Sequence, residues 1–234
     1  MAKIDVIAFD ADDTLWHNEP HYRQMEKEFI HILTGYGIPE QESLHVMHQI
    51  EIDNLTCFGY GVRGFTLSMI EAAVQVTQGN AKATDIQRIV DLGRALTRYQ
   101  IELLDGVEAT LTALKKRPLW LITKGDVLDQ ESKVSRSGLA GYFSTIEVVT
   151  DKTPNIYQGL LKKHQIDTAG FLMVGNSLRS DIVPVLAIGG FAVHVPYPSS
   201  WAHESMADLP EDCSRLFEIK NLNDLPALIQ QIEE

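Results

Sequence analysis

The chain has 234 residues, of which 44% are hydrophobic and 22% are charged. This composition is ordinary for a globular protein and argues against a disordered one. The formal net charge is -12, so the average field repels nucleic-acid backbones and anionic membrane surfaces. We therefore expect neither as a partner. A small anionic substrate is still compatible with this charge, because a bound cation can reverse the field inside one cleft.

The cysteines and the apolar segments indicate a cytoplasmic protein. Cys57 and Cys213 are far apart and outside any CxxC or Cys/His spacing, which predicts buried free thiols. The first residues enter an apolar strand without a signal-peptide core, and no later apolar run reaches the ~20 residues needed to cross a bilayer. The sequence gives no indication of the oligomeric state.

The first element along the chain is a short apolar run over 4–9 that ends at Asp10, a pattern typical of a buried parallel strand. Residues 17–104 then contain amphipathic helices with no strand between them. These helices are expected over 25–33, 41–55, 65–77 and 84–103. Residues 17–104 are therefore predicted to form an inserted four-helix domain.

From residue 105 onward, apolar runs alternate with amphipathic stretches. Strands are expected near 119–122, 146–149, 171–174, 191–195 and 215–219, and helices near 107–117, 126–138, 155–165, 179–188 and 222–233. Such alternation predicts a Rossmann-like, doubly wound parallel sheet, whose ligands bind beyond the carboxyl ends of the strands. Residues 1–16 and 105–234 are expected to form this core domain.

Asp10 and Asp12 lie two residues apart where the first strand ends. Carboxylates this close at the edge of a core repel one another and lose hydration unless a cation or hydrogen-bond donors stabilise them. The spacing therefore favours a metal site, although Asp12 and Asp13 could instead simply open a turn.

Further polar residues follow the later strands. Thr123 comes after the second strand, Lys152 after the third, and the segment 175–181, with Asn176 and Asp181, after the fourth. Oxygen ligands suit Mg2+, a hydroxyl and an ammonium can hold phosphate oxygens, and a carboxylate oxygen can attack phosphorus.

In this order, these segments resemble the four motifs of the haloacid dehalogenase superfamily. Those motifs are an Asp-x-Asp-x-Thr/Val strand end, a Ser/Thr, a Lys, and an acidic Gly-Asp-x-x-x-x-Asp loop. The matching residues are the segment 10–14, Thr123, Lys152 and the segment 175–181. The position of the helical insert also matches the cap of the first type in that family.

The resemblance implies that Asp10 is the nucleophile and becomes an aspartyl-phosphate. Asp12 would be the general acid and base, and its backbone carbonyl would bind Mg2+. Thr123 and Lys152 would hold the phosphoryl oxygens. Lys152 is preferred over Lys133 as the catalytic amine, since it follows a strand and precedes Thr153-Pro154, as the family pattern requires.

The implied metal ligands are Asp10, Asp12, Asn176 and Asp181. Two positions depart from the family pattern. Asn176 stands where Asp is commoner, and Lys124 follows Thr123 where many relatives carry Asn. Lys124 is therefore a candidate for binding substrate, as is Arg63 in a glycine-rich loop of the insert.

The expected function is Mg2+-dependent hydrolysis of a small phosphorylated metabolite. Superfamily members that release halide lack a carboxylate at the position of Asp12, because no alkoxide leaving group needs a proton, so Asp12 favours phosphoryl transfer. A phosphosugar mutase also needs this residue and is one alternative. A non-catalytic scaffold that binds a protein through its cap is the other.

Overall fold

The computed structural model describes residues 3–199, 201–205 and 207–234. The chain divides into two compact units. The core unit consists of Met1–Glu19, Ile101–Lys124 and Gln130–Glu234, and the helical unit of Pro20–Gln100 and Gly125–Asp129. Among the described residues, no helix combines the length and the apolar character needed to cross a bilayer. Both cysteines are free, as predicted, but neither is buried: Cys57 is exposed and Cys213 is half-buried.

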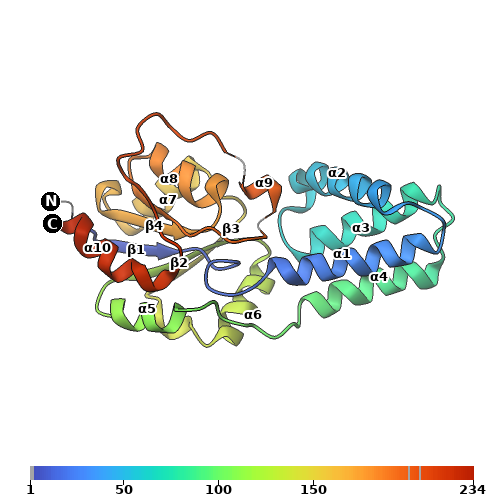
Figure 1. The fold of residues 1–234 in the computed structure, drawn as a ribbon, viewed down its shortest axis with the longest axis horizontal. Helices are drawn as coiled ribbons and strands as arrows, with labels where there is room; N and C mark the ends of the chain where they lie inside the picture. The colour runs from blue at the N-terminus through green and yellow to red at the C-terminus, as the bar shows by residue number, and fades with distance from the viewer. Residues whose placement is uncertain (1–2, 200, 206) are drawn as a thin grey trace. The chain divides into compact units, whose positions relative to one another are not determined.

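The core unit is built on a parallel sheet. Its strands are β1 (Val6–Phe9), β2 (Leu119–Lys124), β3 (Thr145–Val149), β4 (Phe171–Gly175), β5 (Phe191–His194) and β6 (Leu216–Glu218). They lie in the order β3-β2-β1-β4-β5-β6, and every neighbouring pair is parallel. This order changes direction at β1, which confirms the predicted Rossmann-like, doubly wound sheet (Figure 1).

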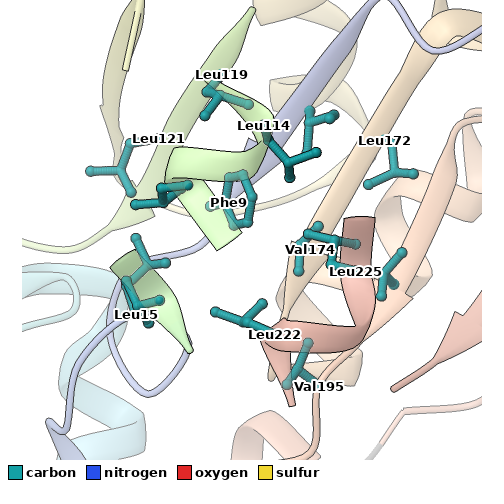
Figure 2. Packing of buried hydrophobic residues seen from close by; sticks show 14 of the residues in the cluster. Phe9, Leu15, Leu114, Leu119, Leu121, Leu172, Val174, Val195, Leu222 and Leu225 are labelled. Carbon is teal, nitrogen blue, oxygen red and sulfur yellow. The ribbon is translucent and has the colours of Figure 1, made fainter. Parts of the chain in front are cut away.

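Helices pack on both faces of this sheet. They are α5 (Val107–Leu114), α6 (Val127–Ser137), α7 (Pro154–His164), α8 (Val183–Ala187) and α10 (Leu225–Glu233). The short α9 (Ala202–Ser205) instead contacts the helical turn Leu178–Ile182. Alternate residues of β1 point to opposite faces. Ile7 and Phe9 join a hydrophobic cluster with α5 and α10, whereas Val6 and Ala8 join a second cluster with α7 and α8. Figure 2 shows the first cluster, in which Leu114 and Leu225 lie over the strands.

The helical unit has a hydrophobic core of its own. Its helices are α1 (Glu19–Thr34), α2 (Glu40–Phe58), α3 (Val62–Val76) and α4 (Ala83–Leu96). Each helix contributes a fully buried side chain to a single cluster, namely Phe29, Met47, Met69 and Ile89. Because this apolar surface is buried within the unit, the insert has the packing expected of a separate domain.

The last helix of the insert is shorter than the sequence predicted. A helix was expected over 84–103, but α4 ends at Leu96. Leu103 instead pairs with Trp16 in an antiparallel bridge, and the Leu104 amide donates to the Leu15 carbonyl at 3.0 Å. The chain is thus extended where it returns to the core unit, because its backbone groups find partners there rather than in a further helical turn.

Candidate active site

The functional side chains follow the carboxyl ends of the strands. Asp10 comes directly after β1, and its amide donates to the Val174 carbonyl of β4 at 2.9 Å. Thr123 is the penultimate residue of β2, and Asn176 follows β4. Parallel strands bring these ends to one edge, so the fold itself assembles residues that are far apart in sequence.

An ion triad of Asp10, Lys152 and Asp181 occupies this edge. The Lys152 ammonium donates to Asp10 Oδ1 at 2.5 Å and to Asp181 Oδ1 at 2.7 Å, and all three side chains are buried. Lys152 lies just before α7. The side chain of Thr153 accepts from the Ile156 amide and caps this helix, which fixes the backbone next to Lys152.

Burial and mutual repulsion shift the titration of this triad. Burial raises the pKa of Asp10 to about 7; Lys152 opposes this rise, and the neighbouring Asp181 charge adds to it. Burial alone would lower the pKa of Lys152, but the two carboxylates outweigh it and hold the pKa well above its ordinary value. Lys152 is therefore a permanent positive charge beside Asp10.

Thr14 joins Asp10 to the loop after β4. Its hydroxyl lies 3.0 Å from Asp10 Oδ2 and 3.2 Å from the Asn176 side-chain oxygen, and it accepts from the Asn176 amide at 3.1 Å. These bonds leave Asp10 little rotational freedom. Such restraint suits a nucleophile that must meet its target in one orientation.

Contacts within the loop that follows β4 restrain the Asp181 side chain. Residues Leu178–Ile182 form one π-helical turn, and the Ser177 amide donates to Asp181 Oδ2 at 3.0 Å. A Cβ atom at Gly175 would lie only 2.2 Å from the same oxygen, so a residue with a side chain would displace the carboxylate.

The donor set at this edge fits a hard cation such as Mg2+. When both carboxylates of the triad are ionised, one ammonium leaves a net negative charge for a cation to balance. Among the described residues, no three His, Cys, Asp or Glu side chains gather into a metal-holding group. The remaining ligands would be the Asn176 amide oxygen, the Asp12 carbonyl and water, and Mg2+ usually keeps several waters in proteins.

The Asp12 carboxylate is held by α6 and by Trp16. Its Oδ1 accepts from the Trp16 indole at 2.7 Å and from Lys133 at 3.0 Å, and its Oδ2 accepts from Gln130 and from Lys133, each at 2.8 Å. Burial raises the pKa of Asp12, but Lys133 and the other donors outweigh it and lower the pKa below its ordinary value. The carboxylate is therefore anionic in this conformation.

Gln130 also contacts Thr123, whose buried hydroxyl donates to Gln130 Oε1 at 2.9 Å. The sequence-based assignment missed Gln130 and considered Lys133 only as a rival of Lys152. The sequence nevertheless contains a pattern that could have identified both residues. They lie three residues apart on the helix after Thr123, on one helical face, and polar residues there can reach the strand end.

Lys124 is engaged by a residue from a distant segment. Its ammonium donates to Glu204 at 2.7 Å and to the Ser180 hydroxyl at 2.8 Å, and Glu204 also accepts from Ser177. Burial raises the pKa of Glu204, yet Lys124 and the hydroxyl donors lower it to about 2. No sequence pattern pointed to Glu204. That Lys124 binds substrate stays a prediction.

Arg63 belongs to the helical unit. Its guanidinium pairs with Asp126 of the same unit at 2.9 Å, and its side chain is 60% exposed. A contact between Arg63 and substrate likewise stays a prediction.

Replacing Lys152 with Met is expected to destabilise the fold by about 3–5 kcal/mol at pH 7, because two buried carboxylates would lose their counter-charge. This loss of stability should be smaller at pH 5, because the Asp10 carboxylate, whose pKa is raised, takes up a proton there. Urea unfolding with EDTA at both pH values measures this. The control is Lys163→Met, which removes an exposed ion pair with Glu147 worth at most about 1 kcal/mol. Equal losses in the two variants would contradict the expectation.

The chain is similar to known hydrolases over most of its length. A family model described as haloacid dehalogenase-like hydrolase matches residues 4–189. A solved haloacid dehalogenase-like family hydrolase from Xanthomonas campestris is 39% identical, with a TM-score of 0.86, and the match covers 99% of this chain and 97% of that one. A 2-haloacid dehalogenase from Pseudomonas syringae shares the fold at 20% identity, a TM-score of 0.64, and coverage of 98% and 99%.

A curated relative is a glyceraldehyde 3-phosphate phosphatase from Pyrococcus furiosus. It is 26% identical over 213 residues, which are 84% of this chain and 82% of the relative. The family model covers most of the chain and includes all the strand-end residues described above. The protein is therefore an enzyme of the haloacid dehalogenase-like hydrolase family.

Proposed function

We propose that this enzyme is a Mg2+-dependent phosphomonoester hydrolase that acts on a small phosphorylated metabolite through an aspartyl-phosphate. The observation that carries the proposal is the second carboxylate, Asp12, two residues after the restrained carboxylate of Asp10. An alkoxide leaving group needs a proton, and a halide does not. The phosphatase name of the Pyrococcus furiosus relative supports the same choice.

In the first step, an Asp10 oxygen forms a bond to phosphorus while the bond from phosphorus to the ester oxygen breaks. Asp12, whose pKa its donors lower in this structure, must first take up a proton, which it then gives to the departing alkoxide. In the second step, Asp12 takes a proton from a water molecule that attacks phosphorus, and phosphate leaves Asp10. Asp12 thus ends the cycle protonated, and Asp10 ends it as a free carboxylate.

Lys152 and Thr123 would neutralise and orient the phosphoryl oxygens during both steps. Asp10, Asp181, Asn176 and the Asp12 carbonyl would hold Mg2+, which when bound would offset the negative charge of the phosphoryl group.

We further propose that residues 17–104 act as a cap that selects the substrate, whereas residues 1–16 and 105–234 carry the chemistry. The insert has its own hydrophobic core, so its surface can vary without disturbing the strand ends. Lys124 and Arg63 are the first residues to test for contact with the leaving group or with a second anionic group.

The proposed function is tested by phosphate release from a panel of p-nitrophenyl phosphate and phosphorylated sugars, nucleotides, amino acids and glycolytic acids. Each compound is assayed with Mg2+, with EDTA, and with a bisphosphate activator. We expect Mg2+-dependent release that EDTA abolishes and that the activator does not raise. Isomerisation of a sugar phosphate without net phosphate release would instead identify a mutase, and inertness towards the whole panel would favour a binding protein.

Replacing Asn176 with Asp is expected to lower the Mg2+ concentration for half-maximal activity by about 3–30-fold, which corresponds to about 0.6–2 kcal/mol of binding free energy. A carboxylate binds Mg2+ more strongly than the amide oxygen of Asn176 does. The maximal rate should stay flat or fall, because added negative charge opposes an anionic substrate.

Titration of Mg2+ against activity compares Asn176→Asp with Asn221→Asp. The control adds the same charge at an exposed position where the side chain caps a helical turn, a task that Asp also performs. An unchanged or higher half-saturating concentration for Asn176→Asp would place Asn176 outside the metal site.

A further inference from the structure

Lys133 is a buried lysine that belongs to none of the four motifs. It lies on α6, its side chain is only 2% exposed, and it is among the largest fully buried side chains of the described residues. A lysine ammonium loses much hydration free energy on burial, so a buried lysine needs strong partners. Its partner here is Asp12, reached by two hydrogen bonds of 2.8 and 3.0 Å.

The four contacts to Asp12 come from three side chains. Lys133 bridges both carboxylate oxygens, Gln130 donates to one of them, and the Trp16 indole donates to the other. A carboxylate that accepts on both oxygens from fixed donors cannot rotate freely about its side-chain torsions. Lys133 is the donor that restrains both oxygens at once, so it contributes most to the orientation.

The donors also connect Asp12 to the adjacent strand end. Gln130 accepts from Thr123 while donating to Asp12, and Lys133 lies one helical turn further along α6. Lys133 is in addition 3.3 Å from the Asn18 side-chain oxygen. The Lys133 ammonium is therefore held by more than one contact, and it restricts the orientation of the Asp12 carboxylate.

We infer that Lys133, assisted by Gln130, is a positioning residue that sets the Asp12 carboxylate where it exchanges a proton with the leaving oxygen and the attacking water. The inference rests on the proposed function. Lys133 acts through Asp12 and touches neither substrate nor phosphorus. General acid catalysis depends on the acid lying within hydrogen-bond reach of the ester oxygen, so a displaced Asp12 should cost rate mainly where the leaving group needs a proton.

This dependence on the leaving group separates positioning from a merely structural role. The ratio kcat/KM reports the steps up to release of the alcohol, and p-nitrophenolate departs without a proton whereas an alkoxide does not. A loss of folding or of metal binding would lower kcat/KM for both esters alike. A misplaced acid lowers it for the alkyl ester alone.

The experiment measures kcat/KM of Lys133→Met for p-nitrophenyl phosphate and for the alkyl phosphate that the wild type hydrolyses fastest in the panel above. We expect a loss of about 10–100-fold for the alkyl ester and of less than about 3-fold for the aryl ester. The control, Arg136→Met, lies on the same helix, where Arg136 donates to Ser132 at 3.2 Å on the surface. It should lose less than about 2-fold on either ester.

A double-mutant cycle with Asp12→Asn checks that Lys133 acts through Asp12. Once Asp12 cannot donate a proton, adding Lys133→Met should lower kcat/KM for the alkyl ester by less than about 3-fold. Circular dichroism shows whether each variant is folded. If Lys133→Met does not fold, Lys133→Arg takes its place, because it keeps the buried charge but presents a planar fork instead of a point ammonium.

Equal losses on the two esters, no loss on either, or a full additional loss in the Asp12→Asn background would overturn the inference. Failure of the proposed function itself looks different, since the wild type would then release no phosphate from either ester with Mg2+. The inference alone fails when the wild type and Asp12→Asn behave as proposed but Lys133→Met matches Arg136→Met.

Discussion

Replacing Asp10 with Asn is expected to lower kcat for p-nitrophenyl phosphate by about four orders of magnitude or more, without unfolding the protein. The amide lacks the anionic oxygen that attacks phosphorus, and removal of a true nucleophile usually costs this much. The fold should tolerate the change, because Asn has nearly the same shape, burial already disfavours the Asp10 charge, and Asp181 still pairs with Lys152.

The measurement is steady-state phosphate release with saturating Mg2+, with a thermal unfolding curve for each variant. The control is Asp53→Asn, which makes the same chemical change on an exposed turn of α2 in the helical unit. If Asp10→Asn keeps more than about a tenth of the wild-type rate while Asp12→Asn is inactive, the two roles have been assigned the wrong way round.

Replacing Asp12 with Asn is expected to lower kcat/KM for an alkyl phosphate by roughly 10²–10⁴-fold, the usual contribution of a general acid. The loss for p-nitrophenyl phosphate should be much smaller, since p-nitrophenolate leaves without a proton. The amide oxygen can still accept from Trp16 and Lys133, whereas the amide nitrogen replaces the oxygen that accepted from Gln130 and Lys133.

Values of kcat/KM for a series of phosphate esters, whose leaving groups differ in basicity, measure this effect. The expected result is a steeper dependence on leaving-group pKa for Asp12→Asn than for the wild type. Parallel lines for the two proteins would show that Asp12 donates no proton to the ester oxygen, and its carboxylate would then need another role.

Much of the fold and part of the site could be predicted from the sequence, because both rest on local patterns. Short apolar runs that end in polar residues identify β1, β2 and β4, and parallel strands necessarily bring those ends together. The contacts of Asp10 with Lys152, and of Lys152 with Asp181, agree with that expectation. The chemical roles of these residues still depend on the family resemblance and stay proposals.

The rest depends on tertiary contacts that leave no local pattern. The end of α4 could not be placed because residues 101–104 find their partners near Trp16, more than eighty residues earlier. Glu204 reaches Lys124 from a short helix with no motif of its own. The hydrogen bonds between Lys133 and Asp12 could not be predicted, because a lysine on an amphipathic helix is usually exposed. Only the packed structure shows that Lys133 is buried.

The most direct test of covalent phosphoryl transfer to Asp10 is to trap the intermediate. Enzyme mixed with p-nitrophenyl phosphate and Mg2+ is quenched in acid within a few turnovers, digested, and analysed by mass spectrometry. We expect the peptide that contains Asp10 to carry one phosphoryl group, with a larger labelled fraction in Asp12→Asn, because loss of the base slows hydrolysis of the aspartyl-phosphate. Sustained phosphate release with no label on Asp10 in either protein would contradict a covalent mechanism through this residue.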